Sequence, residues 1–143
     1  MCENDKVKVF FPYWSFKISK ELLNKYECIG FHMTDLPYGR GGSPLQNLIL
    51  RGFTETVITA FRITDEWDAG PIYCKRPLSL EGTAQEIFDR ASNIIYNDMI
   101  PFILTHEIEP VPQEGEVVCF HRINRSEFPW PERMWDAWGY NYG

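Results

Sequence analysis

The chain has 143 residues, 44% of them hydrophobic, and this length fits one domain with its own apolar core. Twenty Asp and Glu against fourteen Lys and Arg give a net charge of −6 without a basic cluster, which argues against a large nucleic-acid interface. No apolar run is long enough to cross a bilayer, and residues 1–6 lack the pattern of a signal peptide, so we expect a cytoplasmic protein with no membrane partner.

The first part of the chain predicts a strand, a helix and a second strand. Residues 7–14 are interpreted as a buried strand that ends in a turn, because Pro12 cannot continue a central ladder. Ser19 is a suitable N-cap for a short amphipathic helix that reaches Tyr26, and residues 27–31 form the next strand. A helix between two strands is typical of a βαβ crossover, which makes the two strands parallel.

A loop rich in glycine and proline follows this second strand, and His32 stands where the strand ends. Glycine allows backbone N–H groups to come close to a ligand, so the loop is a candidate binding segment. Beyond it, Ser43 and Pro44 predict the start of a helix that stops at Gly52.

The second half predicts two strands and a long helix. Residues 54–61 and 71–76 are interpreted as strands, and Asp68 lies on the loop between them, from which it could fold back toward the histidine. Residues 83–86 form a capping box at the start of the clearest helix, which Pro101 kinks or ends. The apolar residues of this helix recur at helical spacing and predict a packing element: Ile87, Phe88, Ala91, Ile94, Ile95, Met99 and Phe102.

A turn region at residues 109–116 precedes a last short strand at residues 117–122. We divide the chain into a domain of residues 1–125 and an aromatic-rich tail of residues 126–143. Three tail residues spaced four apart suggest a helical stripe, which either docks on the domain or is an exposed surface for a partner: Trp130, Met134 and Trp138.

These elements predict an α/β layer structure. Strands beginning at Val7, Glu27, Thr54 and Pro71 form a mostly parallel sheet with helices on its faces, and the last two strands are candidates for an antiparallel pair. Four widely separated cysteines have no Cys-x-x-Cys pair and few histidines nearby, so we expect reduced thiols, mostly in the core, and no metal site: Cys2, Cys28, Cys74 and Cys119.

The motifs around the histidine resemble the folate-dependent formyltransferase family, which includes methionyl-tRNA formyltransferases, nucleotide-sugar N-formyltransferases and formyl-tetrahydrofolate hydrolases. That family has the pattern Asn-x-His, x-Ser-Leu-Leu-Pro, an Arg-Gly-rich loop with Pro-x-Gln, and a later Leu-Asp-x-Gly segment. Several matches in the same order, between about residues 9 and 110, make the resemblance specific. The matching residues are His32, Thr34, Leu36-Pro37, Arg40-Gly41, Pro44-Leu45-Gln46 and Trp67-Asp68-Ala69-Gly70.

The resemblance implies a partial Rossmann-like formyltransferase core that uses 10-formyltetrahydrofolate. It implies that the loop after the first strand holds the pterin ring largely through backbone groups, although core filling is an equally good interpretation of the aromatic side chains there. The residues implied in cofactor binding are Pro12, Tyr13, Trp14, Leu36, Arg40, Gly41 and Trp67.

Formyl transfer to an amine needs a proton acceptor for the amine and a donor for the oxyanion that develops. The resemblance assigns His32 and Asp68 as the catalytic pair, with Thr34 in the place of the family serine. Gly30 stands where the family has the asparagine that donates to the oxyanion, so protonated His32 or the Thr34 hydroxyl would have to substitute. Asp35, at a family leucine position, either pairs with Arg40, contacts the amino group of the acceptor or faces solvent.

Only about six residues precede the first strand, where the family has the first half of its Rossmann-like domain. We therefore expect the strand at residues 7–11 to be an exposed apolar edge. A partial gene product, one half of a split enzyme, and a homodimer or complementing chain that covers the edge all remain open.

Three functions remain open. The first is a formyltransferase acting on a small-molecule amine, preferably a nucleotide-linked amino sugar because no basic RNA-binding segment is present. The second is a non-catalytic remnant that binds folate or a partner chain, which Gly30 and the short N-terminal region support. The third is a hydrolase of the formyl donor, in which water replaces the amine.

Overall fold

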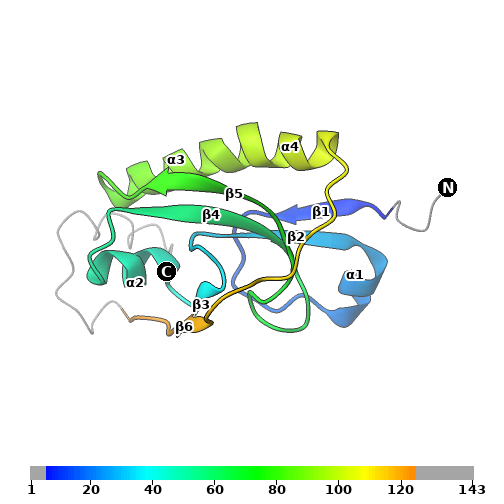
Figure 1. The fold of residues 1–143 in the computed structure, drawn as a ribbon, viewed down its shortest axis with the longest axis horizontal. Coiled ribbons are helices and arrows are strands. Elements are labelled where there is room, and N and C mark those ends of the chain that lie inside the picture. The colour runs from blue at the N-terminus through cyan, green and yellow to red at the C-terminus, as the bar shows by residue number, and fades with distance from the viewer. Residues whose placement is uncertain (1–5, 125–143) are drawn as a thin grey trace.

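The computed structural model describes residues 6–124, and its centre is a twisted sheet with a helical rod across one face (Figure 1). The sheet has the order β1-β2-β4-β5, and a second, two-stranded sheet joins β3 to β6. The strands are β1 (Lys8–Phe11), β2 (Glu27–His32), β3 (Tyr38–Gly41), β4 (Glu55–Arg62), β5 (Ile72–Ser79) and β6 (Val118–Phe120).

The α/β class is confirmed, and the strand directions are mixed. As expected, β1 and β2 are parallel and are linked through α1 (Lys20–Lys25), whose N-cap Ser19 accepts from the Leu22 N–H. The β4–β5 pair is antiparallel, as the sequence allowed for the last two strands. The β2–β4 pair is antiparallel as well, so the four-stranded sheet is mixed and not mostly parallel. The reason is that β4 starts near the end of β2: the connection through α2 (Pro44–Leu50) returns at the same end of the sheet instead of crossing its face.

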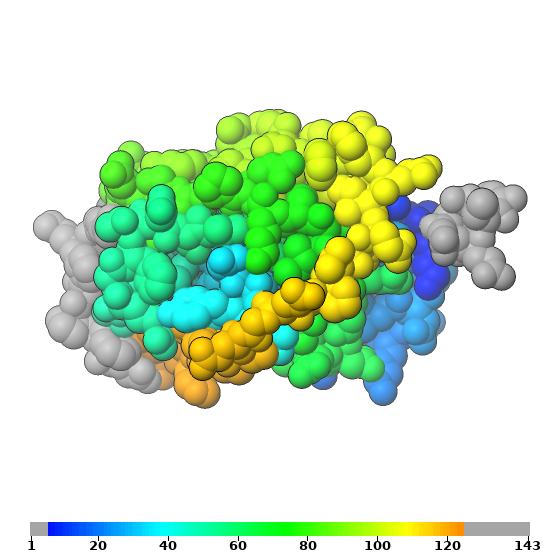
Figure 2. All heavy atoms as spheres, in the orientation of Figure 1, coloured from blue at the N-terminus to red at the C-terminus, as the bar shows by residue number. Residues whose placement is uncertain are grey.

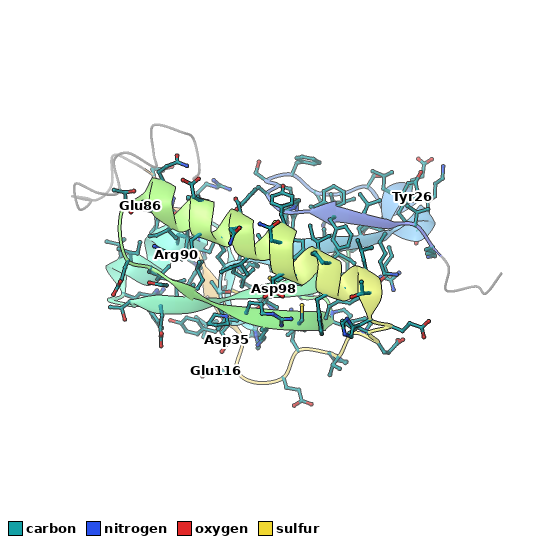
Figure 3. The ribbon with its side chains drawn as sticks, turned by 90° about the horizontal axis from the view of Figure 1, so that it is seen from above. Tyr26, Asp35, Glu86, Arg90, Asp98 and Glu116 are labelled. Carbon is teal, nitrogen blue, oxygen red and sulfur yellow. The ribbon has the colours of Figure 1, made fainter. Side chains whose placement is uncertain are left out.

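The helical rod consists of α3 (Ala84–Ile94), a π-helical turn η1 (Ile95–Met99) and α4 (Ile100–Thr105). The predicted capping box is confirmed: the Thr83 hydroxyl accepts from the Glu86 N–H at 3.1 Å, and the Glu86 carboxylate accepts from the Thr83 N–H at 3.0 Å. Figure 3 shows Glu86 at the start of the rod and Asp98 farther along it. Pro101 does not end the helix, because the wider π turn directly before it accommodates a residue without a backbone N–H.

The main core lies between the sheet and this rod. It contains Ile29 and Phe31 of β2, Ile58 of β4 and the inward face of α3, including Ile87 and Ala91. A smaller apolar cluster lies on the opposite face of β2, where the side chains of its even-numbered residues point. That cluster contains Ile18, Cys28, Leu36, Phe61 and Ile63, with Trp14 packed against it.

Two local expectations differ from the structure. Ser43 precedes α2 as predicted, but its backbone is left-handed (φ 50°, ψ 53°) and its hydroxyl does not cap the helix; it accepts from the Ile123 N–H at 3.2 Å. The glycine-rich segment, expected to be only a loop, contains β3, which pairs in parallel with β6. The β3 strand is too short and too rich in glycine to show strand periodicity in the sequence.

Some expectations concern the ends and the surface of the chain. Among residues 6–124, β1 pairs only with β2, so its other edge carries no strand. Cys28, Cys74 and Cys119, which lie in the described part of the chain, are free thiols; Cys28 is buried and Cys119 is exposed, so Cys119 does not fill the core. No helix in the described part is long and apolar enough to cross a membrane. The tail stripe of Trp130, Met134 and Trp138, with the boundary at residue 125, lies outside the described residues.

Candidate active site

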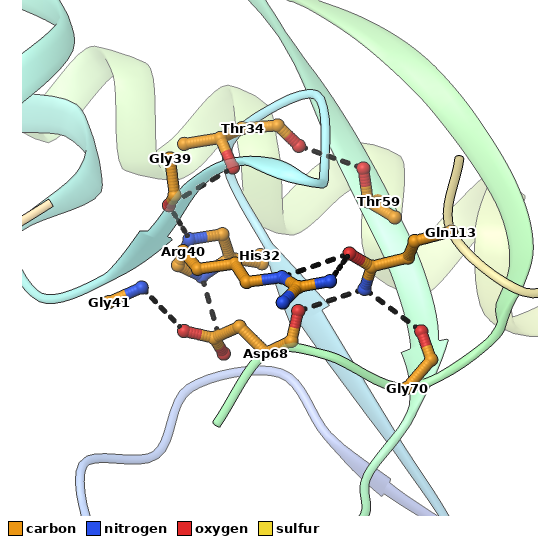
Figure 4. Close-up of polar contacts among 9 residues, drawn as sticks. All are labelled: His32, Thr34, Gly39, Arg40, Gly41, Thr59, Asp68, Gly70 and Gln113. Carbon is orange, nitrogen blue, oxygen red and sulfur yellow. Dashed lines mark hydrogen bonds and ion pairs between the residues drawn. The ribbon is translucent and has the colours of Figure 1, made fainter. Parts of the chain in front are cut away.

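His32 is the last residue of β2 and is almost fully buried. Its Nε2 lies 2.7 Å from the carbonyl oxygen of Gly39. A carbonyl oxygen can only accept, so this contact assigns the proton of the neutral ring to Nε2. Nδ1 then keeps its lone pair, and it lies 3.8 Å from Oδ1 of Asp68 (Figure 4). Nδ1 is therefore the ring atom that is free to take up a proton.

Asp68 lies on the loop between β4 and β5, and the structure brings it to His32 as the sequence predicted. Its carboxylate is 6% exposed, and Oδ2 accepts from the Gly41 N–H at 2.9 Å. The other oxygen is left to face the imidazole. The carboxylate therefore lies beside Nδ1, where it orients the imidazole ring.

Two glycines near the pair pack directly against neighbouring backbone, Gly41 against β6 and Gly70 against the end of β4. A Cβ at Gly41 (φ 108°) would lie 2.2 Å from the carbonyl oxygen of Phe120, and a Cβ at Gly70 would lie 1.7 Å from that of Arg62. No side chain fits at either distance. These positions need glycine because backbone approaches backbone there.

His32 and Asp68 line a pocket of about 570 Å³, which is within the usual size range of small-molecule sites. Of the residues that the resemblance implied in cofactor binding, five line this pocket: Pro12, Tyr13, Trp14, Gly41 and Trp67. The rest of the wall comes from residues that were not named as site residues, although several of them lie in the glycine-rich segment or in the matched Pro-x-Gln motif: Ser15, Phe31, Met33, Gly42, Ser43, Pro44, Leu45, Gln46, Phe88 and Arg122.

Three predicted site residues do not line the pocket. Thr34 is fully buried, and its hydroxyl donates to the Gly39 carbonyl at 3.4 Å, the same oxygen that His32 contacts. Leu36 belongs to the smaller apolar cluster. Arg40 bonds the side chain of Gln113, through Nε at 3.2 Å and Nη2 at 2.8 Å. These three residues therefore lie outside the pocket wall.

The Trp14 ring lies where a side chain at position 30 would be. A Cβ built on Gly30 would lie 2.4 Å from Cη2 of Trp14 and 3.1 Å from Ile63. The indole ring, which also packs on Phe61 with ring centroids 6.0 Å apart, therefore fills the volume into which a side chain at position 30 would extend. An oxyanion donor at position 30 is sterically excluded while Trp14 stays where it is.

Asp35 does not pair with Arg40. It forms an ion pair with Lys75 on β5, and the same ammonium group donates to the Leu36 carbonyl at 3.0 Å. Neighbouring elements therefore hold this exposed carboxylate at the rim of the loop. Within residues 6–124, no group of three or more His, Cys, Asp or Glu side chains is arranged to hold a metal ion.

Gln113 is the main residue that the sequence analysis missed. Its side chain bonds Arg40, Asp68 and Gly70 at once, from a connection between α4 and β6 that was interpreted only as a turn region. A glutamine after a proline has no local pattern that indicates such a role. Arg122 and Phe88 were missed for the same reason, because only the folded chain brings them to the pocket.

No family model matches the sequence. A methionyl-tRNA formyltransferase of Bacillus cytotoxicus is 32% identical over an alignment of 118 residues, and the match covers 77% of this chain and 38% of that protein. One from Listeria monocytogenes is 33% identical over 109 residues, and covers 72% of this chain and 35% of its own length. The chain thus spans little more than a third of the curated relatives that it matches.

Solved structures agree with these relatives. A methionyl-tRNA formyltransferase from Clostridium thermocellum is 47% identical with a TM-score of 0.82, and the match covers 94% of this chain and 60% of that one. HypX from Aquifex aeolicus, solved with tetrahydrofolic acid, shares the fold at 18% identity and a TM-score of 0.70, over 83% of this chain and 22% of that one. Sequence relatives and fold give the same answer: the chain belongs to the formyltransferase family.

Proposed function

We propose that the chain takes part in folate-dependent formyl transfer from 10-formyltetrahydrofolate to an amine. The observation that carries this proposal is the buried His32–Asp68 pair on the wall of a pocket that also includes residues 12–14 and the glycine-rich segment. HypX and PseJ, which share the fold, were solved with tetrahydrofolate, so a pterin donor is the first ligand to test.

The pocket residues fit such a donor. Tyr13, Trp14 and Phe88 supply flat apolar surfaces, and polar residues line the same cavity, among them Ser15, Ser43 and Gln46. An aromatic ring system with polar edges is suited to a wall that combines both kinds of surface. The bound donor would supply an activated formyl group beside His32.

The chain's own residues would move the proton. Nδ1 of His32 would accept it from the attacking amine while Asp68 holds the ring, and the ring would return it to the folate nitrogen that leaves when the carbon–nitrogen bond of the donor breaks. The contact of Nε2 with the Gly39 carbonyl keeps the ring in the orientation that this step needs. The burial of both groups excludes water and strengthens their electrostatic interaction.

The acceptor is the finer part of the proposal. The sequence favoured a nucleotide-linked amino sugar, and two similar folds belong to sugar formyltransferases at 17% and 18% identity. The relatives from Bacillus cytotoxicus and Malacoplasma penetrans, at 32% and 30% identity, are methionyl-tRNA formyltransferases. Methionyl-tRNA is therefore the first amine to test, with a nucleotide-linked amino sugar as the second.

One observation favours a second candidate, donor binding without transfer. Trp14 fills the space beside Gly30, so this chain offers no side chain there for the developing negative charge. Loss of one oxyanion donor typically lowers the rate on the order of a hundredfold or more. A chain that binds the folate but transfers nothing is consistent with that geometry.

The decisive experiment combines calorimetric titration with a product assay. The purified 143-residue chain is titrated with a non-hydrolysable formyl-folate analogue and then incubated with the true donor and each amine. Saturable binding with a formylated product in the mass spectrum supports transfer. Binding without product favours the second candidate, and formate release without an amine indicates hydrolysis. No binding by the folded chain overturns the proposal.

A partner strand on the open edge of β1 is the last part of the proposal. β1 pairs only with β2 among the described residues, and its residues are half-buried. Light scattering over a wide concentration range tests this prediction. A dimer mass, or a complex with a complementing chain, supports it, whereas a folded monomer throughout contradicts it.

A further inference from the structure

Gln113 lies on the connection that leads from α4 to β6. This connection crosses the face of the molecule as a narrow band over the glycine-rich segment (Figure 2). Gln113 is 73 residues from Arg40 and 45 residues from Asp68 in the sequence, yet its side chain bonds both. A single carboxamide thus joins three segments that come together only in the folded chain.

The hydrogen bonds of this carboxamide use all of its polar groups. The amide nitrogen donates to the Asp68 carbonyl at 2.8 Å and to the Gly70 carbonyl at 2.9 Å. The amide oxygen accepts from Nε and Nη2 of Arg40 (Figure 4). Two carbonyls on one side and a guanidinium on the other fix which end of the amide is nitrogen, so the orientation of the amide is determined by its partners.

The loop that it bonds has an unusual backbone. Asp68 is a non-glycine residue at φ 53°, in the left-handed region, which persists only where the surroundings enforce it. Gln113 holds the carbonyl of Asp68 and that of Gly70 from one atom. With both carbonyls held, the backbone places Asp68 where its carboxylate accepts from the Gly41 N–H and faces His32.

We infer that Gln113 is a positioning residue, which holds Asp68 in the left-handed conformation that presents its carboxylate to His32. Gln113 does not line the pocket and acts only through Asp68. The inference rests on the proposed function, since it assigns to Gln113 the geometry of the pair that transfers the proton.

Two substitutions test the oxygen and the nitrogen of the carboxamide: one removes both groups, and the other removes only the N–H donor. Gln113→Met keeps the length of the side chain and removes all four hydrogen bonds. Gln113→Glu restores an acceptor for Arg40 but places an oxygen, in place of an N–H donor, against the two loop carbonyls. Gln85→Met is the matched control, because Gln85 bonds only Asp89 within the exposed face of α3. We expect both Gln113 variants to lose at least tenfold in kcat with the Kd for the formyl-folate analogue within twofold of the unchanged chain, and the control to lose nothing.

A second readout does not depend on activity. The ¹⁵N chemical shifts of the His32 imidazole report which ring nitrogen carries the proton and what faces the other. Both Gln113 variants are expected to change the Nδ1 shift, and Gln85→Met is expected to leave it as it is. In the unchanged chain, the side-chain amide protons of Gln113 should exchange with solvent at least tenfold more slowly than those of Gln85, a measurement that needs no variant to fold.

The outcomes separate this inference from the proposed function. If the unchanged chain neither binds the donor nor forms product, the proposed function fails, and the imidazole shifts and amide exchange still decide whether Gln113 positions Asp68. If the unchanged chain is active and Gln113→Glu matches it in kcat and in the His32 shifts, the inference is overturned. Fast exchange of the Gln113 amide protons in the unchanged chain overturns it as well.

Discussion

The two faces of β2 are held by different forces. Ile29 and Phe31 point into the main core under α3, where contact is apolar and close-packed. Gly30 and His32 point to the opposite face, where Trp14 and the Asp68 loop cover them. The first face depends on volume and the second on particular polar atoms and one close approach. Substitutions on the apolar face should therefore lower the stability of the fold, whereas substitutions of the polar groups on the other face should lower activity.

His32→Ala breaks the polar face and has the largest expected effect. A positioned proton acceptor typically contributes a hundredfold to ten-thousandfold, so we expect formyl transfer to fall on the order of a thousandfold while the near-UV circular dichroism is kept. The matched control is His106→Ala, because His106 is exposed at the end of α4 and does not line the pocket. Full activity in the His32 variant would exclude it from the reaction.

Ile87→Ala breaks the apolar face. Ile87 is completely buried in the main core, and a cavity of this kind lowers the free energy of unfolding by roughly 3 kcal/mol. Urea denaturation measures the change. Leu104→Ala on the exposed side of α4 should change it by less than about 0.5 kcal/mol. Equal effects from the two variants would contradict the placement of the core.

The apolar face is also the part of the molecule that the sequence could predict. The spacing of apolar residues from Ile87 onward, the capping box at Thr83 and the crossover between the first two strands all depend on local patterns, and the structure has each of them. The direction of β4 was expected wrongly, because nothing in its own residues states at which end of the sheet it begins.

The polar face could be predicted only where a motif marked it. His32 and Asp68 were paired from their positions in a resembled pattern, and the structure brings them together. Gln113, Arg122 and the contact between Trp14 and Gly30 were not predicted, because each joins residues far apart in the sequence and none has a local signature. Thr34 and Leu36 were placed in the site by the motif, and they lie behind it because their side chains point away from the pocket wall.

Gly30→Ala tests the close approach on the polar face. The added methyl group would meet the Trp14 ring at 2.4 Å, and overpacking of this kind destabilises by roughly 1–3 kcal/mol. The double variant Gly30→Ala/Trp14→Ala should cost less than the sum of the two single variants, since the clash is absent. Thermal unfolding of all four chains completes the cycle. Strict additivity would mean that Trp14 does not fill the space beside Gly30.

Glu86→Gln is the smallest test and sharpens the account of α3. Hydrogen bonds from the Thr83 backbone and side chain lower the pKa of Glu86 below its usual value. A carboxylate with a lowered folded pKa stabilises the fold above its unfolded pKa, near 4.5, and that stabilisation is lost as the pH falls through the folded pKa. Between pH 6 and pH 3, the melting temperature of Glu86→Gln should therefore fall less than that of Glu107→Gln. Glu107 lies on the exposed segment after α4 and serves as the control.

The π turn decides which way the end of the helical rod faces. Five core residues recur at strict intervals of four, Ile87, Ala91, Ile95, Met99 and Ile103, and each is at most 2% exposed. In an unbroken α-helix a four-residue interval drifts by about 40° per step, which would rotate Ile103 roughly 160° away from Ile87, to the solvent side. The π turn at Ile95–Met99 has more residues per turn than an α-helix, which offsets this drift. A four-residue repeat therefore still forms one continuous apolar stripe against the sheet.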